Sequence, residues 1–380
     1  MISKFVLLFM VSDLPQSEAT LSENTEIGGY IMLDHDYRGP FYDKTSQEYQ
    51  HHSEIRRSKL GIKYSPNSAF QSKLQLKYSR QFPESGSLSL GDAYLRLEHP
   101  SRNALQFGKM KQPFSLQQLT SSSAIGAIER SLPTSAFSPG RSIGLLFDRK
   151  KKRYTLATGY FIDRETEDEF SLDNFDLFEP NNGDIEAATL RATYAPYLKK
   201  SLNLHLGFST SKQWFNGKKI QFKERGEIHS ADSIIRSARF YAQSGLLYQV
   251  EFAHQSHNTL IQAELFNNII TPENNTNWHF KGGYVQLRHH FSGNYRYKYG
   301  KYKPSKYQYQ GFEFILRQSY LDLRDNNVGS EASISLIGLN YSFNKYFKLM
   351  VNAAIPWISG DTINNDTSGH GYSVRGQLNF

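Results

Sequence analysis

The sequence has no cysteine and no long apolar run. Without cysteine, the chain has no disulfide framework, no thiolate metal ligand and no cysteine nucleophile. No apolar stretch approaches the roughly 20 residues that a membrane-spanning helix requires. A helical membrane protein is therefore excluded.

Signatures of catalysis and metal binding are also scarce. No Ser-His-Asp arrangement of a hydrolase can be read from the sequence. The histidine pairs His51-His52 and His289-His290 are adjacent in the chain, so in a strand their side chains point to opposite faces and cannot easily share one metal. We predict a protein that is not an enzyme and that needs no cofactor and no metal.

Bulk hydrophobicity is low, although aromatic residues and glycine are plentiful. Only 38% of the residues are hydrophobic, yet the chain holds 26 Phe, 24 Tyr and 27 Gly. A transmembrane β-barrel combines these features because alternate residues face lipid and water, with aromatic girdles at both interfaces. A soluble β-rich protein is the alternative that this composition leaves open.

Period-two alternation of apolar and polar residues runs from end to end, as expected for strands. Residues 70–78, 93–98, 202–209 and 372–380 are clear examples. In a soluble sandwich the polar face would look outward, whereas in a membrane barrel it looks into the lumen. We predict sixteen strands, near residues 26–35, 54–65, 69–79, 90–98, 103–110, 141–148, 153–162, 185–195, 201–210, 246–255, 259–267, 282–291, 311–323, 333–343, 346–355 and 371–380.

The connections alternate between short turns and long loops, which is the arrangement of outer-membrane barrels. The longest loops are expected at residues 111–140, 163–184 and 211–245. Residues 292–310 break the rule, since they should form a short turn but comprise nineteen residues with five lysines or arginines. This segment is either functional or an ordinary solvated loop.

The N-terminus resembles a secretory signal. An apolar stretch at residues 5–11 follows Lys4 and precedes Ser17, Glu18 and Ala19, a small-x-small cleavage pattern. We expect a signal peptide over residues 1–19 and one barrel domain over residues 20–380. Export argues against nucleic acid as the partner of a chain whose net charge is +8, so an anionic solute is favoured.

Cations at lumen-facing positions are candidates for selectivity, because a charged ring at a constriction decides which ions pass. Arg57, Lys59 and Lys63 alternate with the lipid-facing Leu60 and Ile62, and Arg191 passes the same test. The alternative is that these cations only keep the lumen hydrated and do not select ions.

The loop after the fifth strand is the best candidate for the constriction. It carries Lys111, a run of hydroxyls that includes Ser121 and Ser122, and then Arg130 and Arg141. Hydroxyls and cations together can replace the hydration of an oxyanion. A serine-rich surface loop would instead be exposed.

These residues resemble the phosphate-selective porin O and P family. The similar segments include Asp92-Ala93-Tyr94-Leu95 and Leu119-Thr120-Ser121-Ser122, and they keep the same order over nearly the whole mature chain. Further similar segments are residues 56–61, 107–109, 113–114, 129–133, 136–141, 283–286, 300–304 and 319–323.

The resemblance implies an all-β fold, namely a 16-stranded antiparallel transmembrane β-barrel with an inward-folded third loop, assembled as a homotrimer in the bacterial outer membrane. It also implies a ladder of arginines, a central anion site and a cluster of lysines. Carried over by motif, the implied residues are Arg57, Asp92, Ser121, Ser122, Arg130, Arg225, Lys301 and Lys303. The C-terminal Phe380 resembles the signal read by the barrel-assembly machinery.

The sequence departs from the family pattern in the third loop. Phosphate-selective members carry a lysine shortly before the Thr-Ser-Ser run, where this chain has Gln117 and Gln118, and they carry an aromatic residue at the position of Lys59. The prediction is therefore a channel for passive diffusion of small anions, with phosphate or polyphosphate as possible solutes. A porin for another solute and an outer-membrane hydrolase are the alternatives.

Overall fold

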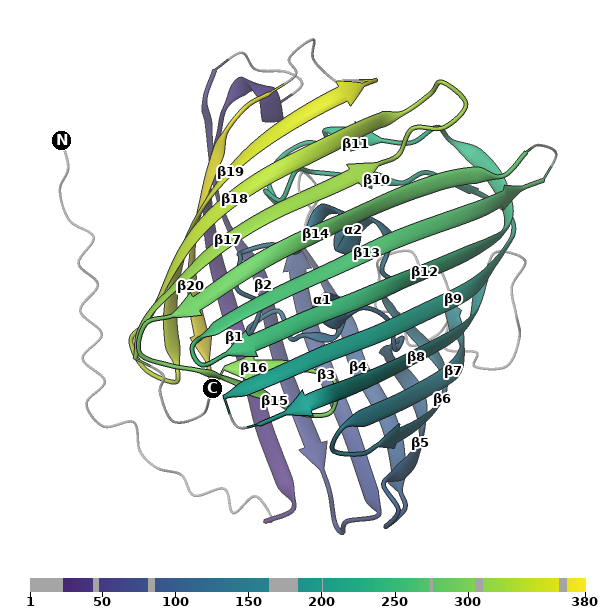
Figure 1. Cartoon of the computed structure of the whole chain (residues 1–380), viewed down its shortest axis with the longest axis vertical. Helices are drawn as coiled ribbons and strands as arrows, with labels where there is room; N and C mark the ends of the chain where they lie inside the picture. The colour runs from purple at the N-terminus through teal and green to yellow at the C-terminus, as the bar shows by residue number, and fades with distance from the viewer. Residues whose placement is uncertain are drawn as a thin grey trace.

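The computed structural model describes residues 23–43, 48–80, 86–163, 184–199, 201–273, 276–304, 310–361 and 368–380. Sixteen strands form one closed barrel in which each strand pairs antiparallel with its neighbours in the chain order, and β1 pairs with β20 (Figure 1). All sixteen predicted strands are confirmed. The expected signal peptide at residues 1–19 lies outside the described residues. The strands are β1 (Thr25–Arg38), β2 (Gln50–Tyr64), β3 (Phe70–Arg80), β4 (Gly86–Glu98), β5 (Asn103–Lys111), β6 (Arg141–Lys150), β7 (Tyr154–Asp163), β8 (Ile185–Leu198), β9 (Leu202–Ile220), β12 (Phe240–Ser256), β13 (Thr259–Pro272), β14 (Trp278–His290), β17 (Gly311–Asp322), β18 (Ser330–Ser342), β19 (Phe347–Gly360) and β20 (Gly371–Asn379).

Side chains alternate between the two faces of the wall, as the sequence predicts. On β2, Leu60 and Ile62 are 48% and 44% exposed on the outer face. Lys59, which precedes Leu60, points to the lumen and is buried. The outer face is apolar and the inner face polar, which suits a wall between lipid and water. Within the described residues no helix is long and apolar enough to cross a membrane.

The expected long loop at residues 211–245 is wrong at both ends. β9 continues to Ile220 and β12 begins at Phe240, so the ribbon that they form extends well beyond the predicted strands. Between them, β10 (Lys223–Glu224) and β11 (Ile235–Arg236) form a small separate sheet. A register shift where Ala242 and Ser244 face β9 hides the alternation that would have revealed the extension.

A second irregularity places two arginines of β2 in the lumen. The pairing of β2 with β1 jumps from Arg57 opposite Met32 to Ile55 opposite Leu33, which leaves Arg56 as an extra residue. Such a bulge turns consecutive side chains to the same face. Both Arg56 and Arg57 therefore reach the third loop, where they donate hydrogen bonds to Glu129 and Ser122.

The third loop lies inside the barrel, as predicted. It contains α1 (Leu116–Leu119) and α2 (Leu132–Phe137), and α2 packs against β13, β14 and β17 (Figure 1). The loop joins an apolar cluster on the inner side of β9 to β19. The cluster also includes η1 (Pro40–Tyr42) and residues from Ile228 to Ile235 of the fifth loop, which connects β9 and β12. This cluster fills one side of the lumen, so a water-filled path is left to the side of β1 to β8.

The described part of the long segment, residues 292–304, folds inward as well. β15 (Tyr295–Tyr297) and β16 (Tyr302–Pro304) form a hairpin whose Tyr302 hydroxyl donates a hydrogen bond to Asn203 Oδ1 of the wall. At its tip, Tyr299 accepts a hydrogen bond from Arg102 in the turn between β4 and β5. The hairpin thus crosses the end of the barrel that carries the short turns.

Candidate anion passage

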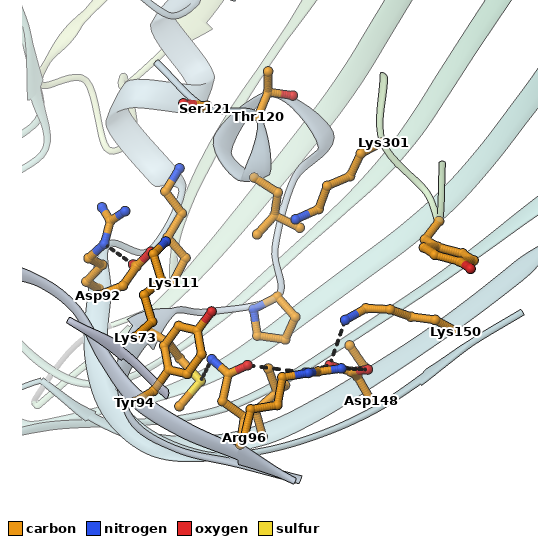
Figure 2. A pocket seen from close by; sticks show the side chains of 18 of the residues that line it. Lys73, Asp92, Tyr94, Arg96, Lys111, Thr120, Ser121, Asp148, Lys150 and Lys301 are labelled. Atoms are coloured by element: carbon orange, nitrogen blue, oxygen red, sulfur yellow. Dashed lines mark hydrogen bonds and ion pairs between the residues drawn. The ribbon is translucent and has the colours of Figure 1, made fainter. Parts of the chain in front are cut away.

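A cavity of about 560 Å³ lies between β1 to β8, the third loop and the β15–β16 hairpin (Figure 2). Nine lysine or arginine side chains and three carboxylates line it, so cations prevail. Nine of the twelve predicted residues contribute to this lining, namely Lys59, Asp92, Lys111, Ser121, Ser122, Arg141, Arg191, Lys301 and Lys303.

Three of these lysines have no carboxylate partner. Among the described residues, no Asp or Glu lies within 4.0 Å of the amino group of Lys59, Lys111 or Lys301. Lys59 Nζ lies 5.5 Å from the centre of the Tyr30 ring, and Lys111 Nζ donates to the carbonyl of Gln118. When protonated, these amino groups can therefore offer their charge to an anion in the cavity.

The wall itself turns Lys111 and Arg141 into the lumen. β4 and β5 stop pairing at Ala93 opposite Lys109, while β5 and β6 stay paired as far as Lys111 opposite Arg141. Gly108 sits at this divergence with a φ of +122°, a conformation that favours glycine. The ends of β5 and β6 bend away from β4, so residues of outward parity face the cavity.

Other cations of the passage are neutralised by ion pairs. Asp92 accepts hydrogen bonds from Lys73 and from Arg141, each at 2.6 Å. Arg191 pairs with Glu251 at 2.7 Å and also donates to the carbonyl of Gly300 at the hairpin tip. Arg191 thus positions the hairpin that carries Lys301, rather than presenting a free charge.

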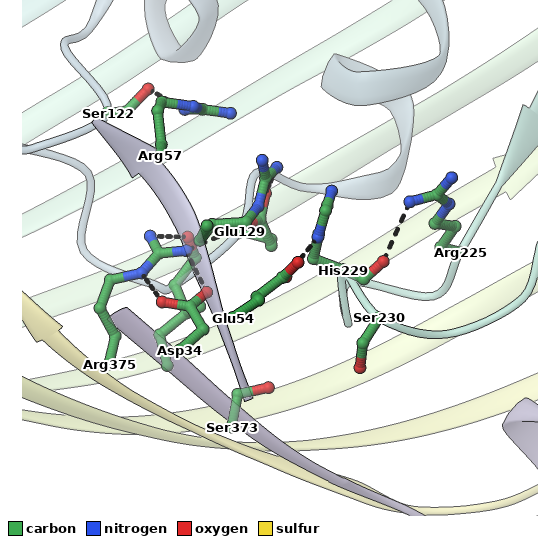
Figure 3. A network of polar contacts seen from close by, with 12 residues as sticks. Asp34, Glu54, Arg57, Ser122, Glu129, Arg225, His229, Ser230, Ser373 and Arg375 are labelled. Carbon is green, nitrogen blue, oxygen red and sulfur yellow. Dashed lines mark hydrogen bonds and ion pairs between the residues drawn. The ribbon is translucent and has the colours of Figure 1, made fainter. Parts of the chain in front are cut away.

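Three predicted residues do not line the cavity. Arg57 donates to Ser122 Oγ at 2.5 Å, and Arg130 donates to the carbonyls of Gln117 and Thr120. Arg57 of β2 thus contacts the third loop, and Arg130 stabilises the loop from within. Arg225 lies in the fifth loop, where it donates to the carbonyl of His229, so the structure does not bring it to the passage (Figure 3).

The hydroxyls of the third loop already have partners inside the loop. Thr120 donates to the carbonyl of Leu116, and Ser121 bonds to Ser123. The two residues that replace the family lysine point elsewhere, since Gln117 accepts from Ser131 and Gln118 donates to the carbonyl of Pro139. The cations that approach this part of the loop are Lys111, Arg57 and Arg130.

Buried carboxyl groups of the wall and of the fifth loop hold the third loop in place. Glu264 of β13 accepts the backbone N–H groups of Leu116 and Gln117 at the start of α1. Glu227 of the fifth loop accepts the N–H of Leu132 at the start of α2 and also pairs with Arg317. Free N–H groups at a helix start are good partners for carboxylates.

A second anchor joins the loop to the first and last strands (Figure 3). Arg375 donates to both carboxylate oxygens of Asp34, to the carbonyl of Ile128 and to Glu129. Burial would raise the pKa of the Glu129 carboxyl, but Arg56 and Arg375 outweigh it and hold that pKa well below the usual range. Glu129 is thus an anion locked between arginines.

Sequence reasoning did not single out the three other cations of the cavity lining, nor Arg56 of the third-loop anchor. Lys73, Arg96 and Lys150 line the cavity, and Arg56 holds Glu129. Lys73 and Arg96 share lumen parity with polar neighbours on their strands, a signal that was present in the alternation. Arg56 had no such signal, because the bulge inverts its parity.

The passage should lose anion preference as the pH rises. Burial lowers the pKa of the Lys301 amino group to about 7, and the nearby Arg191, Lys150 and Lys303 add to the effect. A lysine is cationic below its pKa, so selectivity should be higher at pH 5.5 than at pH 8.5. Reversal potentials at both pH values measure this, and Lys301→Met should depend on pH less than the wild type does.

Neutralising Asp92 should raise the anion preference of the passage. In Asp92→Asn, Lys73 and Arg141 keep a hydrogen-bond acceptor but lose the opposing charge. A unit charge about 8 Å from the ion path contributes about 1 kcal/mol at an effective dielectric constant of about 40, or about fivefold in permeability ratio. We expect the chloride to potassium ratio to rise by about that factor, and an unchanged ratio would contradict a role for Asp92 in the passage.

Comparison with known proteins agrees with this geometry. A relative from Caulobacter vibrioides, an uncharacterised protein, is 29% identical over 231 residues, which are 57% of this chain but only 46% of that protein. OmpT of Vibrio cholerae, expressed in the outer membrane, superposes with a TM-score of 0.60 at 10% identity over 94% of this chain and 97% of the other. An anion-selective porin from Comamonas acidovorans superposes with a TM-score of 0.58 at 11% identity over 94% and 99%.

The structural likeness at such low identity establishes the fold, and the family match extends further. Residues 26–380 match the phosphate-selective porin O and P family, so the match covers all sixteen strands, apart from the first residue of β1, and every described residue of the passage. The chain therefore belongs to the phosphate-selective porin O and P family and is an outer-membrane β-barrel of the channel-forming kind.

Proposed function

We propose that this chain is a passive channel for small anions and that it does not catalyse a reaction. The observation that carries the proposal is the set of three lysines, Lys59, Lys111 and Lys301, which line one cavity and have no carboxylate partner among the described residues. Inward cations raise the local concentration of anions and lower their barrier in a narrow passage. The anion-selective porin from Comamonas acidovorans shares the architecture.

A planar bilayer recording tests this proposal. Under a gradient of potassium chloride, the sign of the reversal potential gives the preferred ion, and we expect chloride to outpermeate potassium. Equal permeability, or a preference for potassium, would show that the unpaired lysines do not govern the passage.

For phosphate, we propose weak rather than tight binding. The hydroxyls of Thr120 and Ser121 bond within the third loop, that of Ser122 accepts a hydrogen bond from Arg57, and Gln117 and Gln118 supply no charge. Loss of one charged donor weakens an oxyanion site by about 1.5 to 3 kcal/mol, or about ten- to a hundredfold. Added phosphate should therefore block the chloride current only at about millimolar concentrations, and block at micromolar phosphate would contradict this proposal.

We also propose that the chain assembles as a homotrimer. Over residues 86–92, β4 pairs with β3 alone, since no described strand covers its other edge. Unpaired backbone groups are costly in lipid, so a neighbouring copy that covers this edge would stabilise the wall. OmpT of Vibrio cholerae, which shares the fold, was solved in a trimer form. Native mass measurement in detergent should give three times the protomer mass, and a monomer mass would reject the assembly.

The remaining proposed partner is the barrel-assembly machinery. Phe380 pairs through its backbone with Gly29 of β1 and leaves its ring half exposed on the outer face. A terminal aromatic ring in this position is accessible to an assembly factor before the barrel closes. Reduced membrane yield after deletion of Phe380 would support this proposal, and an unaltered yield would remove it.

A further inference from the structure

Two neighbouring turns on the short-turn side of the barrel are rich in cations. Residues 149–153 are five consecutive lysines and arginines, and Lys199 begins the turn between β8 and β9. By contrast, the turns at residues 65–69 and 257–258 hold neither lysine nor arginine. The backbone brings the two cationic turns together, because the N–H of Ala195 donates to the carbonyl of Arg153 at 2.6 Å.

Part of this charge faces away from the lumen. Arg149 shares parity with Leu145, which is 53% exposed on the outer face, whereas Lys150 lines the cavity and pairs with Asp148. Arg149 lies opposite Leu156, another exposed apolar residue. The side chain of Arg149 therefore stands on the membrane side of the wall.

Three tyrosines occupy the same outer face beside Arg149. Tyr154 of β7 lies directly opposite Tyr194 of β8, and Tyr197 follows after a bulge. They are 43%, 50% and 39% exposed, respectively. Tyrosine rings with such exposure mark the level of the lipid headgroups in membrane barrels.

The cations beside these rings lack acidic partners. Among the described residues, no carboxylate lies within 4.0 Å of the charged groups of Arg149, Arg153 or Lys199. Lys199 Nζ instead lies 5.1 Å from the centre of the Tyr197 ring. From β6 to β8 the cluster spans two strand spacings, about 10 Å, which is the scale of one phospholipid headgroup. We call these six residues the rim patch: Arg149, Arg153, Tyr154, Tyr194, Tyr197 and Lys199.

We propose that the rim patch binds the headgroup of an anionic phospholipid in the inner leaflet of the outer membrane. The short turns of such barrels face the periplasm, so the patch lies at the level of that leaflet. Arginine and lysine contribute charge-assisted hydrogen bonds to a phosphodiester, and the tyrosines place their hydroxyls among the headgroups. A binding site for an acidic protein would have its cations around the mouth of the barrel, whereas Arg149 points to the lipid side. The site is separate from the ion passage and does not depend on its selectivity.

Native mass spectrometry of the purified protein with added lipid tests this site. Phosphatidylglycerol should remain bound in preference to zwitterionic phosphatidylethanolamine. A cation near an anionic headgroup changes the binding constant by about fivefold, so the double variant Arg149→Gln with Lys199→Gln should bind phosphatidylglycerol about 30-fold more weakly. Both side chains are exposed, so the variant should keep the heat-dependent gel mobility of a folded barrel.

The matched control is Lys345→Gln, which removes a cation that also lies over a tyrosine, at 4.6 Å from the Tyr346 ring, on another short turn. It should leave phosphatidylglycerol binding within about twofold of the wild type. Equal retention of both lipids, or an equal loss in Lys345→Gln, would overturn the proposal. Saturable binding of polyglutamate to lipid-free protein, lost in the double variant while phosphatidylglycerol binding persists, would assign the patch to an acidic protein instead.

Discussion

The double variant Lys111→Glu with Lys301→Glu should convert the channel from anion to cation preference. Both amino groups line the cavity without a carboxylate partner among the residues that the structure describes, so their charge acts directly on a passing ion. At pH 5.5, where Lys301 is protonated, reversing both changes the local charge by up to four units. At about 1 kcal/mol per unit, reduced by mobile counter-ions, the chloride to potassium permeability ratio should fall on the order of 100-fold.

Reversal potentials of the variant and the wild type in the same potassium chloride gradient measure this change. Lys345→Glu is the matched control, because it reverses a lysine on a short turn away from the cavity and should leave the ratio unchanged. If the double variant kept its preference for chloride, the free lysines would not be the selectivity residues. Cations held in ion pairs, such as Arg141 with Asp92, would then have to be reconsidered.

Arg375→Met should release the third loop from the wall. The Arg375 side chain is 1% exposed and holds Asp34, the carbonyl of Ile128 and Glu129 at the same time. Its removal leaves Asp34 buried without its charged partner, which costs about 3 to 5 kcal/mol for a buried pair. The conductance should become larger and noisier, and the barrel should unfold at a lower temperature on a heat-modifiability gel.

Two comparisons make this result specific to the anchor. Arg375→Lys keeps the charge but not the planar fork that reaches both oxygens of Asp34, so its effect should be intermediate. Arg324→Met breaks a half-exposed pair with Asp322 and Glu331 and should cost less than about 1 kcal/mol. If Arg375→Met left the conductance and its noise unchanged, Glu264 and Glu227 would suffice to hold the third loop.

Several site residues could be identified without a structure, because their position in a strand decides which face they occupy. Lys59 and Arg191 were assigned to the lumen by parity, and both line the cavity. Lys111 and Lys301 were found by a different signal, namely cations in long segments at the two ends of the barrel. These segments could be recognised as unusual by length and charge, although their path could not.

The same parity rule failed where the wall is irregular. It assigns Arg56 to the lipid side, but the bulge in β2 turns this arginine inward to Glu129. The inward turn of Arg141 depends on the separation of β5 from β4 at Gly108. Neither irregularity changes the local pattern of apolar and polar residues enough to be seen in the sequence.

The sequence by itself determined the strands, their number and the face on which each regular residue stands. These properties follow from a local geometry that repeats every two residues. It also contains no apolar run long enough for a membrane-spanning helix.

Only the tertiary structure decided which cations are free. Arg375 of β20 finds Asp34 because the barrel closes β20 onto β1, and Arg191 of β8 finds Glu251 of β12 across the intervening β9. Lys59, Lys111 and Lys301 have no such partner among the residues that the structure describes. Charge in a sequence is additive, but its effect on an ion depends on which opposite charge lies within a few ångströms, and that distance is set by contacts between remote parts of the chain.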